Sequence, residues 1–282
     1  MRLRRLVRVL VLVLAAGCTA LPATGPFEQA APATTTADCC TGLQRYPKVL
    51  VDLIEPKANA KEAFTDDKRF RAPFLKGRPE AWAYILRHLA PMDILTTSDK
   101  GILRGQLMPG YFSHSLLYIG TEAQLRAEGL WDLPALRPYH AEIRGGAVFF
   151  EGIVPEVTFS KPETVFAADA VGVYRAPLSA EDKRVALDRA LALHGKPFDW
   201  HFDSRTTDCF YCAEVIDVTL PQLRLPRRLA YGREVIPPDT FAQIALTDPA
   251  RLHLVGYVYG TRHGVESAGP DVLAATLEKA WR

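Results

Sequence analysis

The sequence has few cysteines, almost no net charge and no apolar run long enough to cross a bilayer. Five cysteines in 282 residues are too few for a fold built on disulfides. Lysine and arginine together number 34 against 32 acidic residues, a formal net charge of +2. The hydrophobic fraction of 48% and the charged fraction of 23% are ordinary for a globular protein. This composition excludes a disordered chain, a disulfide scaffold and a low-complexity architecture.

The beginning of the chain has the layout of a secretory signal. Four arginines within the first eight residues precede an apolar run at residues 9–16, and small residues follow. Cleavage before residue 18 would remove these four positive charges and no acidic residue, which changes the net charge from +2 to −2. The basic balance therefore belongs to the leader and does not indicate a nucleic-acid partner. We expect a signal peptide over residues 1–17.

The end of this leader, Leu14-Ala15-Ala16-Gly17-Cys18, resembles the lipobox of bacterial lipoproteins, with Ala15 where leucine is preferred. The resemblance implies that Cys18 is lipidated, while ordinary cleavage nearby is the alternative. Acyl chains would anchor the protein to a membrane. Thr19 stands where aspartate would favour retention at the inner membrane. We therefore expect a protein of the bacterial cell envelope, anchored in the outer membrane and facing the periplasm.

Three regions are expected after the leader. Residues 18–75 are expected to form a tether and N-terminal extension, because residues 19–38 are rich in Ala, Thr and Pro without a hydrophobic period. Residues 76–262 are expected to form one folded domain, and residues 263–282 a C-terminal helix. Helices are predicted at residues 79–90, 179–194, about 207–220 and 270–281. Strands are predicted at residues 93–95, 113–119, 147–151, 154–159, 171–174 and 252–259. This irregular alternation is typical of an α+β domain.

Cys212 is the candidate nucleophile. Thr207 or Asp208 can cap the predicted helix at residues 207–220, which places Cys212 in or just after the first turn. The positive end of the helix dipole lowers the pKa of a thiol there, so that more of the reactive thiolate forms at neutral pH. A buried, inert cysteine is the alternative interpretation.

A nucleophilic cysteine needs a base, and His114 is the candidate. It begins the predicted strand at residues 113–119, from which its side chain can project toward a helix N-terminus. The imidazole can accept the thiol proton and later protonate the leaving group. Six other histidines are present, so the residue type alone does not single out His114.

Three stretches carry a resemblance to a known family. They are Met92-Asp93-Ile94-Leu95, Ser113-His114-Ser115 followed by Leu117-Tyr118-Ile119-Gly120, and Gly195-Lys196-Pro197-Phe198-Asp199-Trp200 followed by Tyr211-Cys212-Ala213-Glu214. In their order and spacing they resemble the permuted papain-like cysteine hydrolases, the YiiX/YebB-like branch of the NlpC superfamily. Met92 replaces the usual glycine and Ala213 the commoner serine.

The resemblance implies a circularly permuted papain-like, NlpC-type fold: a mostly antiparallel sheet with the helix that carries the nucleophile packed against it. It implies a cysteine hydrolase that acts through an acyl-thioester, with residues 76–262 as the catalytic domain and no metal or cofactor. The substrate would be an envelope amide, ester or thioester, either a peptidoglycan peptide or a lipid acyl group.

The resemblance also assigns supporting residues. Glu151 lies in a stretch that matches the next core strand, so it is expected to orient His114, with Glu142 and His140 as alternatives. The oxyanion hole is expected to use the Cys212 main-chain N–H, with Tyr211 or a residue near Asp93 as second donor. Asp199 matches a family residue as well, and a turn or cap role is an equal alternative.

Two other functions remain open from the sequence. Cys209-Phe210-Tyr211-Cys212 has the C-x-x-C spacing of a thiol redox protein, and a disulfide between its cysteines would mask the nucleophile. A non-catalytic lipoprotein that holds an envelope ligand is the second. Zinc is disfavoured, because no second ligand pair has suitable spacing. Whether Cys39 and Cys40 form disulfides or stay free is left open.

Overall fold

The computed structural model describes residues 69–230 and 232–282. The expected signal peptide, the lipidation site Cys18, most of the expected tether, and Cys39 and Cys40 lie outside the described residues. Within the described part no helix is long and apolar enough to cross a membrane.

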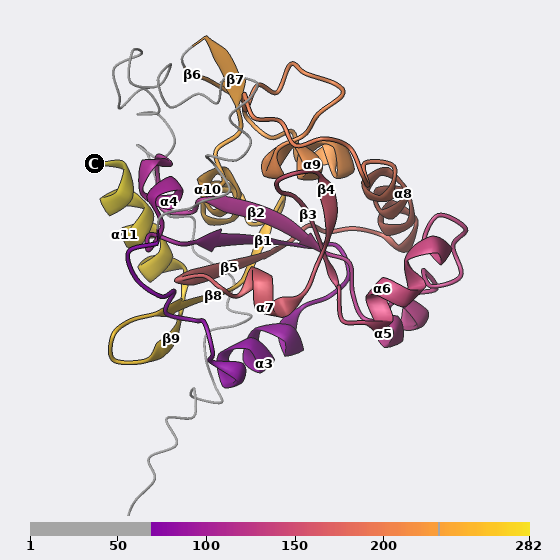
Figure 1. Cartoon of the computed structure of the whole chain (residues 1–282), viewed down its shortest axis with the longest axis horizontal. Helices are drawn as coiled ribbons and strands as arrows, with labels where there is room; N and C mark the ends of the chain where they lie inside the picture. The colour runs from indigo at the N-terminus through magenta and orange to yellow at the C-terminus, as the bar shows by residue number, and fades with distance from the viewer. Residues whose placement is uncertain (1–68, 231) are drawn as a thin grey trace, which may run out of the picture.

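A seven-stranded sheet with antiparallel pairing throughout forms the centre of the fold (Figure 1). From edge to edge its strands are β4 (Val157–Ser160), β3 (Phe149–Gly152), β2 (His114–Tyr118), β1 (Asp93–Ser98), β5 (Ala170–Arg175), β8 (His253–Gly260) and β9 (Val265–Ala268). A separate hairpin consists of β6 (Arg228–Ala230) and β7 (Arg233–Val235). The α+β class predicted from the sequence is confirmed.

Helices cover both faces of the sheet. Figure 1 shows α8 and α9 over one face and α3 over the other. The helices are α3 (Pro79–His88), α4 (Leu103–Leu107), α5 (Glu122–Ala127), α6 (His140–Arg144), α7 (Pro162–Val165), α8 (Ala180–Leu191), α9 (Cys212–Thr219), α10 (Asp239–Thr247) and α11 (Pro270–Trp281). Because both faces are covered, β1 is buried along its whole length despite its polar residues. Those side chains find internal partners, such as Thr96 Oγ1 with Tyr174 OH at 2.9 Å.

The elements with strong local signals form where the sequence predicts them. The predicted helix at residues 270–281 is α11. In α8 the Ser179 hydroxyl accepts from the Asp182 amide at 3.1 Å, and Asp182 accepts from the Ser179 amide at 3.0 Å, so the expected capping box is present. The start predicted for the next helix is wrong, since α9 begins at Cys212 and not near Thr207 or Asp208.

Asp239 ties the C-terminal helix to the segment that leads into β2. Its carboxylate is fully buried and accepts from the main-chain amides of Tyr111 at 2.7 Å and Phe112 at 2.6 Å. It also accepts from the indole N–H of Trp281 at 2.6 Å. At Gly110 the backbone φ is +87°, and an added Cβ would lie 2.3 Å from Asp239 Oδ2, so only glycine fits there. The approach to His114 is therefore held by α10 and α11.

Replacing Trp281 by phenylalanine should destabilise the fold, because Asp239 would keep its burial and lose a donor. A hydrogen bond to a charged group contributes about 1.5–3 kcal/mol. Trp82→Phe is the matched control, since the Trp82 indole donates to the neutral Leu75 carbonyl at 2.8 Å and should cost about 0.5–1.5 kcal/mol. Urea unfolding measures both; equal losses would contradict the role given to Asp239.

Candidate active site

The structure brings Cys212 and His114 together. Cys212 is the first residue of α9, and His114 is the first residue of β2. Helix α9 packs against β2 and β3, so its N-terminus meets the beginning of β2. The thiol and the imidazole are hydrogen-bonded to each other. Two side chains that lie about 100 positions apart along the chain are thus neighbours in the fold.

Glu151 is the partner of the imidazole on its other side. Its Oε2 lies 2.5 Å from His114 Nε2, which leaves Nδ1 of the ring for Cys212. Strand β3 pairs with β2 through Leu117 opposite Phe150, which places Glu151 diagonally across from His114 on the same face of the sheet. The Glu151 side chain is only 4% exposed, while the His114 side chain is 25% exposed. The imidazole is therefore the more exposed side of this pair.

The attraction between opposite charges determines the protonation states of Cys212 and His114. Burial raises the pKa of the Cys212 thiol, but the charge and hydrogen bond of His114, together with hydrogen bonding from Ser115, outweigh it and hold this pKa below its usual value. Burial lowers the pKa of His114, but the Cys212 thiolate and Glu151 together raise it to about 10. Both shifts favour a thiolate beside an imidazolium. This is the form in which a cysteine is most nucleophilic near neutral pH.

The start of α9 is fixed by Tyr211 and Glu214. Tyr211 is the N-cap, and its main-chain N–H donates to Glu214 Oε2 at 3.0 Å. The Tyr211 hydroxyl contacts Ser204 Oγ at 2.7 Å and accepts from the Ile236 amide at 2.8 Å. These contacts make Tyr211 a support for the helix start. The N–H of Cys212 at this start remains the candidate oxyanion donor.

Glu214 carries an unusual protonation state for a carboxyl group. Burial raises the pKa of Glu214 to about 8, and the negative charges of Asp199 and Cys212 act in the same direction. At neutral pH the side chain is therefore mostly neutral. A neutral carboxyl group caps the helix without placing a second negative charge beside the thiolate. The sequence motif contains Glu214, and its spacing of three residues from the N-cap is the signal for this role.

Asp199 shapes the loop that precedes α9. Its side chain is fully buried, and its two oxygens accept from the main-chain amides of His201 and Asp203, both at 2.8 Å. This is the turn role that the sequence left as an equal alternative.

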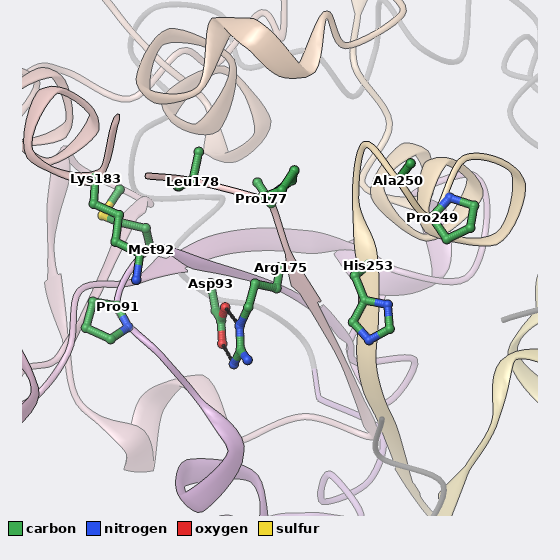
Figure 2. Close-up of a pocket in the computed structure, with 11 residues that line it drawn as sticks. Pro91, Met92, Asp93, Arg175, Pro177, Leu178, Lys183, Pro249, Ala250 and His253 are labelled. Atoms are coloured by element: carbon green, nitrogen blue, oxygen red, sulfur yellow. Dashed lines mark hydrogen bonds and ion pairs between the residues drawn. The ribbon is translucent and has the colours of Figure 1, made fainter. Parts of the chain in front are cut away.

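Asp93 does not join Cys212 and His114. In the β1–β2 pairing Asp93 lies opposite Tyr118, whereas His114 lies opposite Thr97, roughly 13 Å further along the strand. Asp93 instead binds Arg175 through two hydrogen bonds, at 2.7 and 2.8 Å, and both residues line a pocket at this end of the sheet (Figure 2). A donor near Asp93 is thus misplaced for an oxyanion at Cys212.

The remaining candidates also lie away from the pair. His140 stacks on Trp131 with ring centroids 3.7 Å apart, and Glu142 is exposed on α6. Cys209 donates to Thr206 Oγ1 at 3.7 Å, and burial raises its thiol pKa. Both Cys209 and Cys212 are free thiols. In the described residues no three His, Cys, Asp or Glu side chains gather as a metal site.

Two residues that sequence analysis did not assign complete the site. The main-chain amide of Ser115 donates to the Cys212 sulfur and so favours its thiolate. Gly152 lies under the start of α9, where an added Cβ would come within 3.1 Å of main-chain atoms of Phe210 and Tyr211. Glycine at this position lets α9 approach β3 closely. Neither role has a sequence signal, because both arise from the contact between α9 and the sheet.

Comparison of the chain with protein-family models, with curated proteins and with solved structures finds no match in any of the three. The interpretation of the site therefore depends on its own geometry and chemistry.

Removing the charge of Glu151 should lower the pKa of His114. In Glu151→Gln the imidazolium loses its carboxylate partner, so the ring should lose its proton at least about one pH unit below the wild-type value of about 10. Histidine-selective NMR titration measures this directly. Glu142→Gln is the matched control and should leave the His114 titration unchanged; an equal effect of both variants would contradict the assignment of Glu151.

Enlarging Gly152 should separate the cysteine from the histidine. In Gly152→Ala the new methyl group would push the main chain of Phe210 and Tyr211, and with it the start of α9. We expect alkylation of Cys212 by iodoacetamide to slow by up to about 100-fold, because small displacements of reacting groups have large effects. Gly145→Ala at the end of α6 meets its nearest neighbour at 3.2 Å and serves as control. Unchanged labelling in Gly152→Ala would show that this close approach does not position the thiol.

Proposed function

We propose that this protein is a cysteine hydrolase of the permuted papain-like, NlpC type, which cleaves an amide, ester or thioester through an acyl-thioester on Cys212. The observation that carries the proposal is the chain of contacts from Cys212 to His114 to Glu151 at a helix N-terminus. It joins a nucleophile, a base and an orienting carboxylate in the arrangement that acyl transfer requires. The antiparallel sheet with α9 packed on it agrees with the proposed fold type.

The first half of the reaction forms the acyl-enzyme. The Cys212 thiolate attacks the carbonyl carbon, and the negative charge that develops on the carbonyl oxygen is stabilised by the Cys212 N–H at the start of α9. The His114 imidazolium then donates its proton to the leaving amine, alkoxide or thiolate as the bond to the carbonyl carbon breaks. The acyl group remains on sulfur, and His114 becomes neutral.

The second half releases the acid. Neutral His114 accepts a proton from water, and the resulting hydroxide attacks the thioester carbonyl. This proton transfer regenerates the imidazolium, and collapse of the intermediate then releases the acid and expels the Cys212 thiolate, which restores the ion pair. Glu151 holds the ring through Nε2 in both halves, so that Nδ1 faces the reacting atoms throughout.

The contacts of Cys209 give the redox alternative no support. A dithiol redox site needs the two sulfurs to face each other, whereas the Cys209 thiol is directed to Thr206 and its pKa is raised by burial. The pKa of Cys212 is lowered by a histidine and not by a second cysteine.

The place of action is proposed from the leader. The cationic head, the apolar run and the lipobox-like end at Cys18 support export and a lipid anchor in the bacterial cell envelope. The substrate would then be an acyl or peptide component of that envelope.

Cys212→Ala should abolish both hydrolysis and covalent labelling. Loss of the nucleophile should lower turnover by about 10⁴-fold or more. The assay is a panel of peptidoglycan fragments and acyl lipids, with mass spectrometry to detect the acyl-enzyme. Cys209→Ser is the matched control and should retain activity, because this thiol does not contact the pair. Activity that survives Cys212→Ala, or is lost in Cys209→Ser, would refute the proposed mechanism.

A further inference from the structure

A row of small, buried residues crosses the sheet beneath the start of α9. Ser115 of β2 lies opposite Thr96 of β1, and continuing the register of β2 and β3 by two residues places Gly152 opposite Ser115 on its other side. Residues opposite each other point to the same face. This is the face of α9, since a Cβ added at Gly152 would meet the main chain of Phe210 and Tyr211. The Ser115 side chain is therefore enclosed between the sheet and the start of α9.

The hydroxyl group of Ser115 is buried without a regular hydrogen bond. Ser115 is 0% exposed, and its Oγ finds no partner of ordinary hydrogen-bond geometry among the described residues. The neighbouring Thr96 hydroxyl is equally buried, but it contacts the Tyr174 hydroxyl at 2.9 Å. A buried polar group without a partner is unfavourable. Packing of the sheet alone thus does not explain a hydroxyl group at this position.

The Cys212 thiol is the group on which this hydroxyl acts. His114 and Ser115 are consecutive in β2, so their side chains leave the strand on opposite faces. Cys212 interacts with both residues: the imidazole and the Ser115 main-chain amide hydrogen-bond to the sulfur, and the Ser115 hydroxyl acts with them to lower the pKa of the thiol. A hydroxyl hydrogen rotates to suit its acceptor. The sulfur therefore has within reach a further donor that no other described residue engages.

We propose that the Ser115 hydroxyl turns its hydrogen to the Cys212 sulfur when the thiolate forms, and that it stabilises this thiolate together with the Ser115 amide and the His114 imidazolium. A neutral sulfur is a weak acceptor, whereas hydrogen bonds to an ionised acceptor are strong. The hydroxyl is thus unpaired beside the thiol and paired beside the thiolate. The two protonation states of Cys212 differ by one hydrogen bond.

The same donor bears on the acyl-enzyme, as far as the proposed hydrolase function holds. The sulfur of a thioester carries no charge, so acylation of Cys212 leaves the Ser115 hydroxyl unpaired again. Expulsion of the thiolate restores its acceptor. The hydroxyl therefore favours the free thiolate over the acyl-enzyme, which favours release of the acid over accumulation of the intermediate.

The pH dependence of Cys212 alkylation tests the proposal. The full-length protein carries Cys209→Ser, which removes the neighbouring free thiol, and mass spectrometry quantifies iodoacetamide adducts at Cys212. In Ser115→Ala the thiolate loses a donor, so the midpoint of the rate–pH profile should rise by about one pH unit or more. Ser113→Ala is the matched control and should leave the midpoint unchanged, because the Ser113 hydroxyl accepts from the Asp99 amide at 3.4 Å.

Urea unfolding at neutral pH separates this role from a structural one. With Cys212 present, Ser115→Ala should lower the midpoint of unfolding, because the thiolate of the folded state loses a donor. In a Cys212→Ala background the same substitution should cause no loss, since the hydroxyl then has no acceptor. A serine that only supports the packing of the sheet would give the same loss in both backgrounds.

An unchanged alkylation midpoint in Ser115→Ala, an equal shift in Ser113→Ala, or an equal loss of stability in both backgrounds would overturn the role given to Ser115. Neither measurement uses a substrate. Absence of hydrolysis would therefore contradict the proposed function and leave this role intact. An unchanged alkylation midpoint would contradict this role and leave the contact between Cys212 and His114 intact.

Discussion

The attraction between the Cys212 thiolate and the His114 imidazolium is the interaction on which the site depends. Burial opposes each charge when it stands alone, and each becomes favourable only because the other is present. Glu151 stabilises the cation, and the Ser115 amide stabilises the anion. The electrostatics therefore require that α9, β2 and β3 keep their relative positions. The contacts of Gly152, Tyr211 and Asp239 help to hold these elements in those positions.

The parts of this arrangement with local signals could be predicted from the sequence. The capping residues of α8, the extent of α11 and the strand that begins at His114 follow from hydrophobic period and turn chemistry. The meeting of Cys212, His114 and Glu151 followed from a resemblance in motif order, because no pattern in one segment can state which distant segment it contacts. The alternation of β2 and β3 then explains why Glu151 lies on the same face as His114.

Tertiary contacts explain where the sequence was misleading. Thr207 and Asp208 are better intrinsic N-caps than Tyr211, yet both are exposed and α9 begins after them. The loop satisfies its amides through Asp199, and Glu214 reaches back to the Tyr211 amide, so the helix start is displaced along the chain. Helix α10 and the β6–β7 hairpin were not predicted at all, since both are stabilised by distant partners such as Trp281.

The order of strands in the sheet has a consequence for the order in which the protein folds. Strands β1, β2, β3 and β4 are neighbours both in sequence and in the sheet, so this meander can pair early in folding. His114 and Glu151 both belong to it, whereas the cysteine follows much later on α9. We expect a folding chain to hold an inert imidazole–carboxylate pair until α9 docks. The reactive thiolate of Cys212 would then form only in the last steps of folding, after the strands that hold His114 and Glu151 have paired.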